Sequence, residues 1–101
     1  MTLRMRRIDS IRRILTEHKG ELRRRFRVKE IGLFGSFLRK EQKGKSDLDI
    51  LVEFLETPSL FQFIELEDYC SKLVGVKVDL VMKSALKPAI GEQILREVVY
   101  I

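Results

Sequence analysis

The nine residues SDLDILVEF, at positions 46–54, decide the fold of this chain. Leu, Ile, Val and Phe fill most of positions 48–54, so this stretch predicts a buried β-strand. Asp47 and Asp49 interrupt the apolar pattern, although Asp is disfavoured in strands. Because alternate side chains of a strand lie on the same face, both carboxylates are expected on one face and the intervening apolar residues on the core-facing side.

Two interpretations of this acidic pair are open. Carboxylates two positions apart on a strand lie roughly 6–7 Å from each other along the backbone, so Asp47 and Asp49 can converge on one cation. Alternatively, both lie at the solvated mouth of the strand, where one caps the preceding loop and the other bridges to Lys43 or Lys45. The Asp-x-Asp pattern alone does not decide between a metal site and a strand end.

Helix and strand patterns alternate on both sides of this strand, and no repeat or low-complexity tract interrupts them. The expected elements are an amphipathic opening helix carrying Ile8, Ile11, Leu15 and Leu22 that Gly20 breaks or ends, a strand over 28–35, a short helix over 37–42, a helix from Ser59 to Gly75, a strand over 77–82, a helix starting at Pro88, and an edge strand or docked tail over 98–101. The predicted class is α/β (α+β), with a small mixed sheet of three to four strands flanked by helices. With 101 residues, the chain is long enough for one core and too short for two, so residues 1–101 are expected to form a single domain.

Gly35 and Ser36 follow the first predicted strand and precede a predicted helix start. A turn of this kind offers backbone N–H groups to an anion, and the glycine permits close approach of the backbone. The alternative is an ordinary Ser N-cap on a short helix. Both interpretations remain open for this turn taken alone.

Asp79 is a third acidic interruption, within the short apolar strand that contains Val78 and Leu80. Its simplest interpretation is a strand-end Asp that pairs with a nearby Lys. Together with Asp47, Asp49 and the Gly-Ser turn, however, it completes a set suited to two-metal phosphoryl transfer.

The strings GSFLR (35–39), SDLDILVEF (46–54), VKVDLV (76–81), LKP (86–88) and EVVYI (97–101) resemble the signature of minimal nucleotidyltransferases in the DNA polymerase beta superfamily. The resemblance covers nearly the whole chain and implies the nucleotidyltransferase fold. It implies that Ser36 binds nucleotide phosphate with Gly35 beside it, that Asp47 and Asp49 bind two Mg²⁺ ions, and that Asp79 completes the site and helps to deprotonate the attacking hydroxyl. The family commonly has Arg-Gly after the Gly-Ser turn, whereas Arg39 is followed here by Lys40. For Arg39, a phosphate contact and a solvated position are both open.

The same resemblance implies a function. Minimal family members typically pair with a small all-helical HEPN protein, often a ribonuclease toxin, and act as its antitoxin. The implied reaction moves AMP from ATP, or a nucleotide from another nucleoside triphosphate, to a hydroxyl of the partner. A catalytically weak module that neutralises its partner by covering it is the alternative, and a homo-oligomer is possible.

Basic residues are concentrated at the start of the chain. Residues 1–29 hold eleven Lys or Arg against three Asp or Glu, a net charge of +8, whereas residues 30–101 have a net charge of −3. Nucleic-acid binding through Arg23, Arg24, Arg25 and Arg27 is possible but not favoured as the main function, because no aromatic side chains interleave with these arginines to stack on single strands. Attraction to an acidic partner or to nucleotide is the milder interpretation.

Several remaining residues favour plain structural interpretations. Apolar stretches are short, and the Arg-rich start lacks the apolar segment of a signal peptide, so no membrane association and a cytoplasmic location are expected. Cys70 is expected to be a small buried hydrophobe and His18 a surface residue. Phe61 and Ile64 widen the apolar stripe of the helix from Ser59; a partner interface and burial on both sides are open, and the small size of the chain favours burial.

Overall fold

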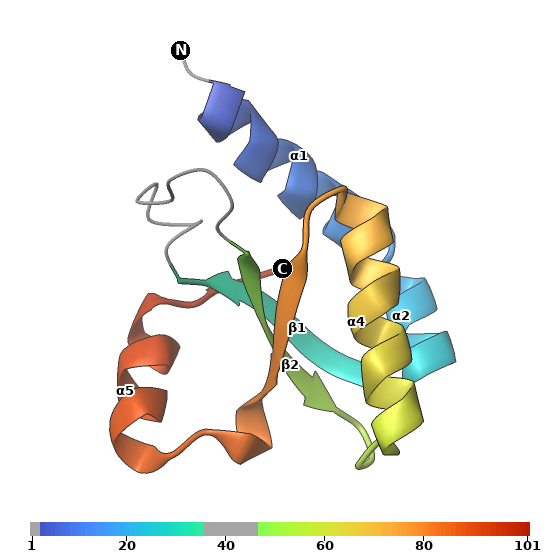
Figure 1. The fold of residues 1–101 in the computed structure, drawn as a ribbon, viewed down its shortest axis with the longest axis vertical. Helices are drawn as coiled ribbons and strands as arrows, with labels where there is room; N and C mark the ends of the chain where they lie inside the picture. The colour runs from blue at the N-terminus through green and yellow to red at the C-terminus, as the bar shows by residue number, and fades with distance from the viewer. Residues whose placement is uncertain (1–2, 36–46) are drawn as a thin grey trace.

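The computed structural model describes residues 3–35 and 47–101, which form a four-stranded mixed sheet with helices around it (Figure 1). The elements in chain order are α1 (Leu3–Glu17), α2 (Lys19–Phe26), β1 (Val28–Phe34), β2 (Leu48–Phe54), α4 (Leu60–Val74), β3 (Val78–Met82), the 3-10 turn η1 (Lys83–Ala85), α5 (Pro88–Glu97) and β4 (Val99–Tyr100). This arrangement confirms the predicted mixed class and sheet. The short helix predicted over 37–42 lies outside the described residues.

The strand order in the sheet is β3-β2-β1-β4. β1 runs antiparallel to both β2 and β4, whereas β2 and β3 are parallel. A parallel pair needs a crossover connection, and α4 supplies it between β2 and β3. The C-terminal segment predicted as an edge strand or docked tail is β4, which pairs with β1 at Gly32 and Leu33.

The hydrophobic core lies between one face of the sheet and the helices α1, α2 and α4, which gather on the same side of it (Figure 1). Leu48, Ile50 and Val52 are fully buried there, as the alternation in β2 predicts. Facing them are residues of the helices: Ile11, Leu15, Leu22, Leu66 and Cys70. Since these positions of β2 point into the core, Asp49 and Glu53 must point to the opposite face of the sheet.

Two helix ends differ in how well the sequence predicted them. α4 begins and ends where expected, with a Ser59 capping box involving Gln62 and a left-handed Gly75 at its C-cap. The break after α1 falls at His18, however, and Gly20 lies inside α2, so the predicted break at Gly20 is wrong. His18 Nδ1 donates a hydrogen bond to the Ile14 carbonyl at 2.8 Å, and the half-buried ring fills the junction between the two helices.

The apolar residues at the start of α4 are the main error in the predicted core. Leu60 is 74% exposed, Phe61 86% and Ile64 52%. Burial of this helix on both sides, the interpretation that the small size favoured, is therefore wrong. Leu66 and Cys70, further along α4, are fully buried as predicted. None of the helices in the described part of the chain is long and apolar enough to cross a membrane.

Candidate functional site

Three aspartates mark one end of the sheet on the face opposite the core. Asp49 and Asp79 are direct partners in the register of the parallel pair β2 and β3. Asp47 precedes β2 by one residue and lies on the same side as Asp49 by strand alternation. Asp47 and Asp49 are half-buried and Asp79 is exposed. The ladder between β2 and β3 thus brings together carboxylates that are about thirty residues apart in sequence.

Gly35, the first residue after β1, completes this end of the sheet. Its φ of 87° lies in the region that favours glycine. A Cβ built on Gly35 would overlap the carboxylate of Asp49, with the Asp49 Cγ only 2.9 Å away. The backbone of this turn therefore lies directly against the Asp49 carboxylate. Any residue with a side chain at position 35 would displace that carboxylate.

The remaining predicted site residues lie outside the described residues. Ser36, Arg39 and both candidate lysine partners, Lys43 and Lys45, fall in the segment 36–46. For Ser36, phosphate binding and helix capping therefore both stay open. For Arg39, a phosphate contact and a solvated position both stay open. The described part of the site consists of Gly35, Asp47, Asp49 and Asp79.

The donor set at this site suits a hard divalent cation, because carboxylate oxygens are the ligands that Mg²⁺ prefers. The site provides three carboxylates. Asp49 lies beside Asp79 across the β2–β3 ladder, and Asp47 lies two positions before Asp49. Among the described residues, no group of three acidic, His or Cys side chains converges closely enough to form a ready-made metal cage. The residues are therefore of the right type and on one face, and Mg²⁺ commonly binds through one or two carboxylates together with substrate phosphates.

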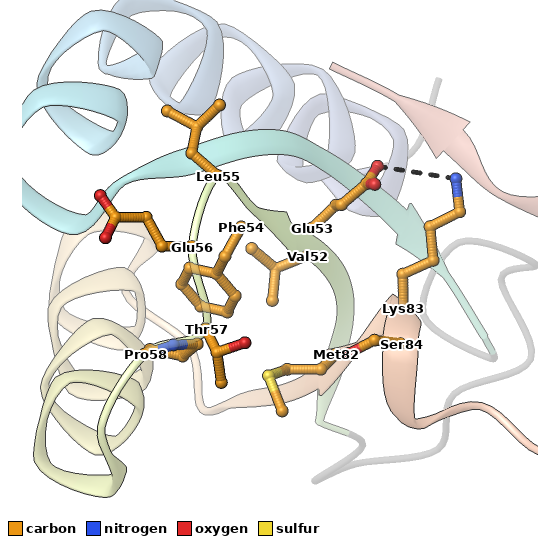
Figure 2. A pocket seen from close by; sticks show the side chains of 10 residues that line it. All are labelled: Val52, Glu53, Phe54, Leu55, Glu56, Thr57, Pro58, Met82, Lys83 and Ser84. Carbon is orange, nitrogen blue, oxygen red and sulfur yellow. Dashed lines mark ion pairs between the residues drawn. The ribbon is translucent and has the colours of Figure 1, made fainter.

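Glu53 lies on the same face of β2 as Asp49, at the other end of the strand, and was not singled out from the sequence. Its carboxylate lies 3.7 Å from Lys83 Nζ and 3.8 Å from Lys29 Nζ, so it is held between cations from two other elements. Figure 2 shows the Glu53–Lys83 pair beside a hollow of about 380 Å³ that Phe54 and Met82 also line. Its position four residues after Asp49, on the same face by strand alternation, was the available signal, but Glu53 is an ion-paired residue apart from the aspartates.

Cys70 behaves as the sequence predicts. It is fully buried in α4, and burial, with the nearby Glu67 charge, raises the pKa of its thiol to about 12. A neutral, buried thiol takes no part in metal binding or nucleophilic chemistry at neutral pH.

Comparison with known families matches residues 15–101 to the nucleotidyltransferase domain. The matched segment includes Gly35 and all three aspartates. It begins within α1 and extends to the last residue of the chain.

Individual relatives agree with this match. The protein adenylyltransferase MntA of Thermococcus cleftensis is 60% identical over 94 residues, which are 93% of this chain and 95% of the relative. A solved minimal nucleotidyltransferase superimposes with a TM-score of 0.70 at 33% identity and covers 88% of this chain and 93% of its own. The MNT antitoxin in a complex with a tri-AMPylated HEPN toxin of Shewanella oneidensis has the same fold, with a TM-score of 0.59 at 19% identity over 97% of this chain and 71% of the other.

Proposed function

This chain belongs to the nucleotidyltransferase domain family, and we propose that it transfers AMP from ATP to a hydroxyl group of a helical HEPN-type protein, whose antitoxin it is. The observation that carries this proposal is the pairing of Asp49 with Asp79 across the β2–β3 ladder, beside Gly35. The name of the 60% identical relative, a protein adenylyltransferase, supports AMP as the group and protein as the acceptor. In this proposal residues 1–101 act as one minimal domain in the cytoplasm.

Each acidic residue has a distinct role in the proposal. Asp47 and Asp49 would hold two Mg²⁺ ions together with the ATP phosphates, and Asp79 completes the set from β3. The ions supply positive charge that stabilises the attacking and leaving oxygens of an in-line displacement. Backbone N–H groups of the turn at Gly35 and Ser36 bind phosphate, and Arg39 adds a charged contact to it.

The reaction follows from these positions. The partner hydroxyl oxygen attacks the α-phosphorus of ATP, and the bond from that phosphorus to the bridging oxygen of pyrophosphate breaks. The hydroxyl proton passes to the Asp79 carboxylate, which is exposed and so accessible to an acceptor that approaches from outside. Pyrophosphate leaves, and AMP remains on the partner as a phosphodiester.

The partner is proposed to complete the site. Asp79 is exposed, so an acceptor group of a partner can approach its carboxylate from outside. In Figure 1, α5 lies apart from the helices α1, α2 and α4 that cover the core. A HEPN toxin bound by an MNT antitoxin of the same fold carries AMP groups in the solved complex, which makes such a toxin the first acceptor to test.

A second candidate function is neutralisation by binding alone. The exposed Leu60, Phe61 and Ile64 at the start of α4 favour it, because a contiguous apolar surface of this kind is typical of a protein interface. Transfer and binding can both operate in one protein, so each needs its own measurement.

ATP labelled at the α-phosphate tests the transfer. With Mg²⁺ and the candidate HEPN protein, label should appear on that protein, whereas label at the γ-phosphate should stay in pyrophosphate. Asp47→Asn with Asp49→Asn should abolish transfer and leave the melting temperature unchanged or higher, because removing carboxylate repulsion does not cost stability.

Glu53→Gln is the matched control, since Glu53 lies on the same face of the same strand but is ion-paired away from the aspartates. It should keep transfer close to the unmodified rate. Equal loss in both variants, or transfer by the double variant, contradicts the assignment of the aspartates. Toxin neutralisation that persists in the double variant without any label transfer supports the binding function instead.

A further inference from the structure

A basic hollow of about 260 Å³ lies between α2 and the start of β1. Lys19, Arg23 and Lys29 line it together with the apolar Leu22, Val28 and Ile31. Arg24 adjoins it as well, because its guanidinium lies 3.3 Å from a Cβ built on Gly20, another lining residue. Four basic residues thus adjoin one depression, and Glu30 is the acidic residue in its lining. Lys19 Nζ also donates to the Ile101 carbonyl at 2.9 Å and Lys29 Nζ lies 3.8 Å from the Glu53 carboxylate, so Arg23 and Arg24 carry most of the charge available to a ligand.

Not all arginines of the N-terminal segment contribute to this hollow. Arg25 stacks over the rings of Phe26 and Tyr69, 5.1 Å from each centroid. Arg27 donates to Glu56 at 2.8 Å. These two arginines are already engaged in holding α2 to its surroundings. Arg12 and Arg13 on α1 are exposed and do not line the hollow.

The surface around the hollow has the composition of a nucleic-acid contact and not of a protein interface. Within residues 8–35, no large apolar side chain is exposed; those that are exposed lie between Leu55 and Tyr100. Protein interfaces centre on buried apolar and aromatic residues. Nucleic-acid contacts are strongly positive and direct most of their hydrogen bonds to phosphate.

We propose that the basic hollow binds phosphate groups of a nucleic-acid backbone without reading its sequence. Lys19 and Arg23 are four residues apart and therefore neighbours on one side of α2, and the guanidinium of Arg24 lies beside Gly20 at the same hollow. Within residues 8–35 no aromatic side chain is exposed, so this segment itself offers bases nothing to stack on. A double helix, which presents phosphates on its outside, is therefore the preferred ligand over a single strand.

The hollow is separate from the aspartate site. It contacts the beginning of β1, whereas Gly35 follows the end of that strand, seven residues from Val28 and thus roughly 20 Å away. Nucleic-acid binding and AMP transfer can therefore be measured independently. Failure of one does not imply failure of the other.

Fluorescence anisotropy with labelled duplexes of about 20 base pairs tests the proposal, because this length exceeds the roughly 16 base pairs that a double-stranded-RNA-binding domain spans. RNA and DNA duplexes should both bind the full chain, more tightly than the single strands, with affinity that falls steeply between roughly 50 and 200 mM salt. Arg23→Gln with Arg24→Gln should weaken duplex binding about tenfold or more and reduce the salt slope by about two. Preference of RNA over DNA would show that the 2′-hydroxyl is also read.

Lys77→Gln with Arg96→Gln is the control of equal charge, because both residues are exposed and belong to other elements. It should change duplex affinity by no more than about twofold, since salt largely screens the attraction between exposed charges that lie more than a Debye length apart. Melting curves of both variants should match that of the unmodified protein. The proposal is overturned if duplexes do not bind at low salt or if the control variant weakens binding equally. It is also overturned if polyglutamate or ATP, added at the same total charge as the duplex phosphates, displaces the duplex from the unmodified protein.

Discussion

Gly35 and Asp49 are in direct contact at the end of the sheet, where a Cβ on Gly35 would overlap the Asp49 carboxylate. Two independent constraints act on this glycine. Its positive φ disfavours any residue with a side chain, and the carboxylate leaves no space for one. The contact places the predicted phosphate turn directly beside the predicted metal ligand Asp49.

Gly35→Ala should therefore reduce both stability and transfer. The left-handed backbone costs an alanine about 1–2 kcal/mol, and overlap with Asp49 adds about 1–3 kcal/mol. Because the overlap is relieved most easily by rotating the Asp49 side chain, we expect AMP transfer to be lost even where the protein still folds. Thermal unfolding and transfer assays measure the two effects separately.

Gly75→Ala is the control for backbone strain. Gly75 also has a positive φ, of 78°, but nothing lies within 4 Å of a Cβ built on it. This variant should lose only the stability that the left-handed backbone costs an alanine, and AMP transfer should stay intact. If both variants lose the same stability and Gly35→Ala keeps full activity, the contact with Asp49 has no functional role.

ATP binding should depend on Mg²⁺, since the clustered carboxylates repel the triphosphate unless a cation lies between them. Calorimetry should show at least about tenfold tighter ATP binding with Mg²⁺ than with a chelator. Asp79→Asn should reduce this difference. Asp68→Asn should leave the difference unchanged, because Asp68 lies on α4, where it pairs with Lys72. Equal ATP affinity with and without the metal would contradict the proposed site.

Stability should fall at high pH because of Cys70. Its folded-state pKa of about 12 exceeds the ordinary value of 9.0, so the folded chain keeps a proton that the unfolded chain releases. The contribution is complete below pH 9 and is lost as the pH rises to 12, at about 1.4 kcal/mol per pH unit. Burial and the hydrogen bond to Glu21 also raise the pKa of Tyr69, which adds a loss of the same sign.

Cys70→Ala isolates this thiol, since Tyr69 and the lysines are unchanged in it. The free energy of unfolding of the unmodified protein should approach or fall below that of Cys70→Ala as the pH rises from 9 to 12. Native Cys70 should also resist alkylation at pH 8 and react once the protein is unfolded. Parallel pH profiles of the two proteins would contradict the raised pKa.

The course of the strands was predictable because their local signals agree. In β2, apolar residues alternate with acidic ones and turn residues flank the strand, so both its limits and its core face follow from the sequence. The break at His18 was not predictable, because Gly20 is the stronger helix breaker by propensity. There, the hydrogen bond from the His18 ring to Ile14 and packing of the junction override propensity.

The site was predictable in composition but not in register. Strand alternation places Asp47 and Asp49 on one face, yet only the crossover through α4 decides which residue of β3 lies beside Asp49. The acidic interruption of a short apolar strand marked Asp79 without that geometry, and the resemblance to a known family implied its role. The contacts of Glu53 with Lys29 of β1 and Lys83 of η1 depend on how β1, β2 and the turn after β3 are arranged, so no local pattern reveals them.

Phe61→Glu and Ile64→Glu, made separately, test whether the exposed start of α4 binds the partner. Both side chains are mostly exposed, so their replacement removes little core packing. The first turn of α4 contains no acidic residue, and a carboxylate there interacts favourably with the helix dipole. The melting temperature of Phe61→Glu should therefore be unchanged or slightly higher. Co-purification with the HEPN-type protein should be lost in both variants, because a charge would be buried without a partner.

Two variants on the same helix define what the result means. Glu65→Gln changes one charge beside the patch and should retain the partner, whereas Leu66→Ala removes a fully buried side chain and should cost about 2.7–5 kcal/mol. Loss of partner binding in Phe61→Glu or Ile64→Glu at an unchanged melting temperature assigns the patch to the interface. If these variants instead melt as Leu66→Ala does, Phe61 and Ile64 contribute to folding. If they bind the partner as Glu65→Gln does, the toxin contacts another surface and the binding function loses its structural support.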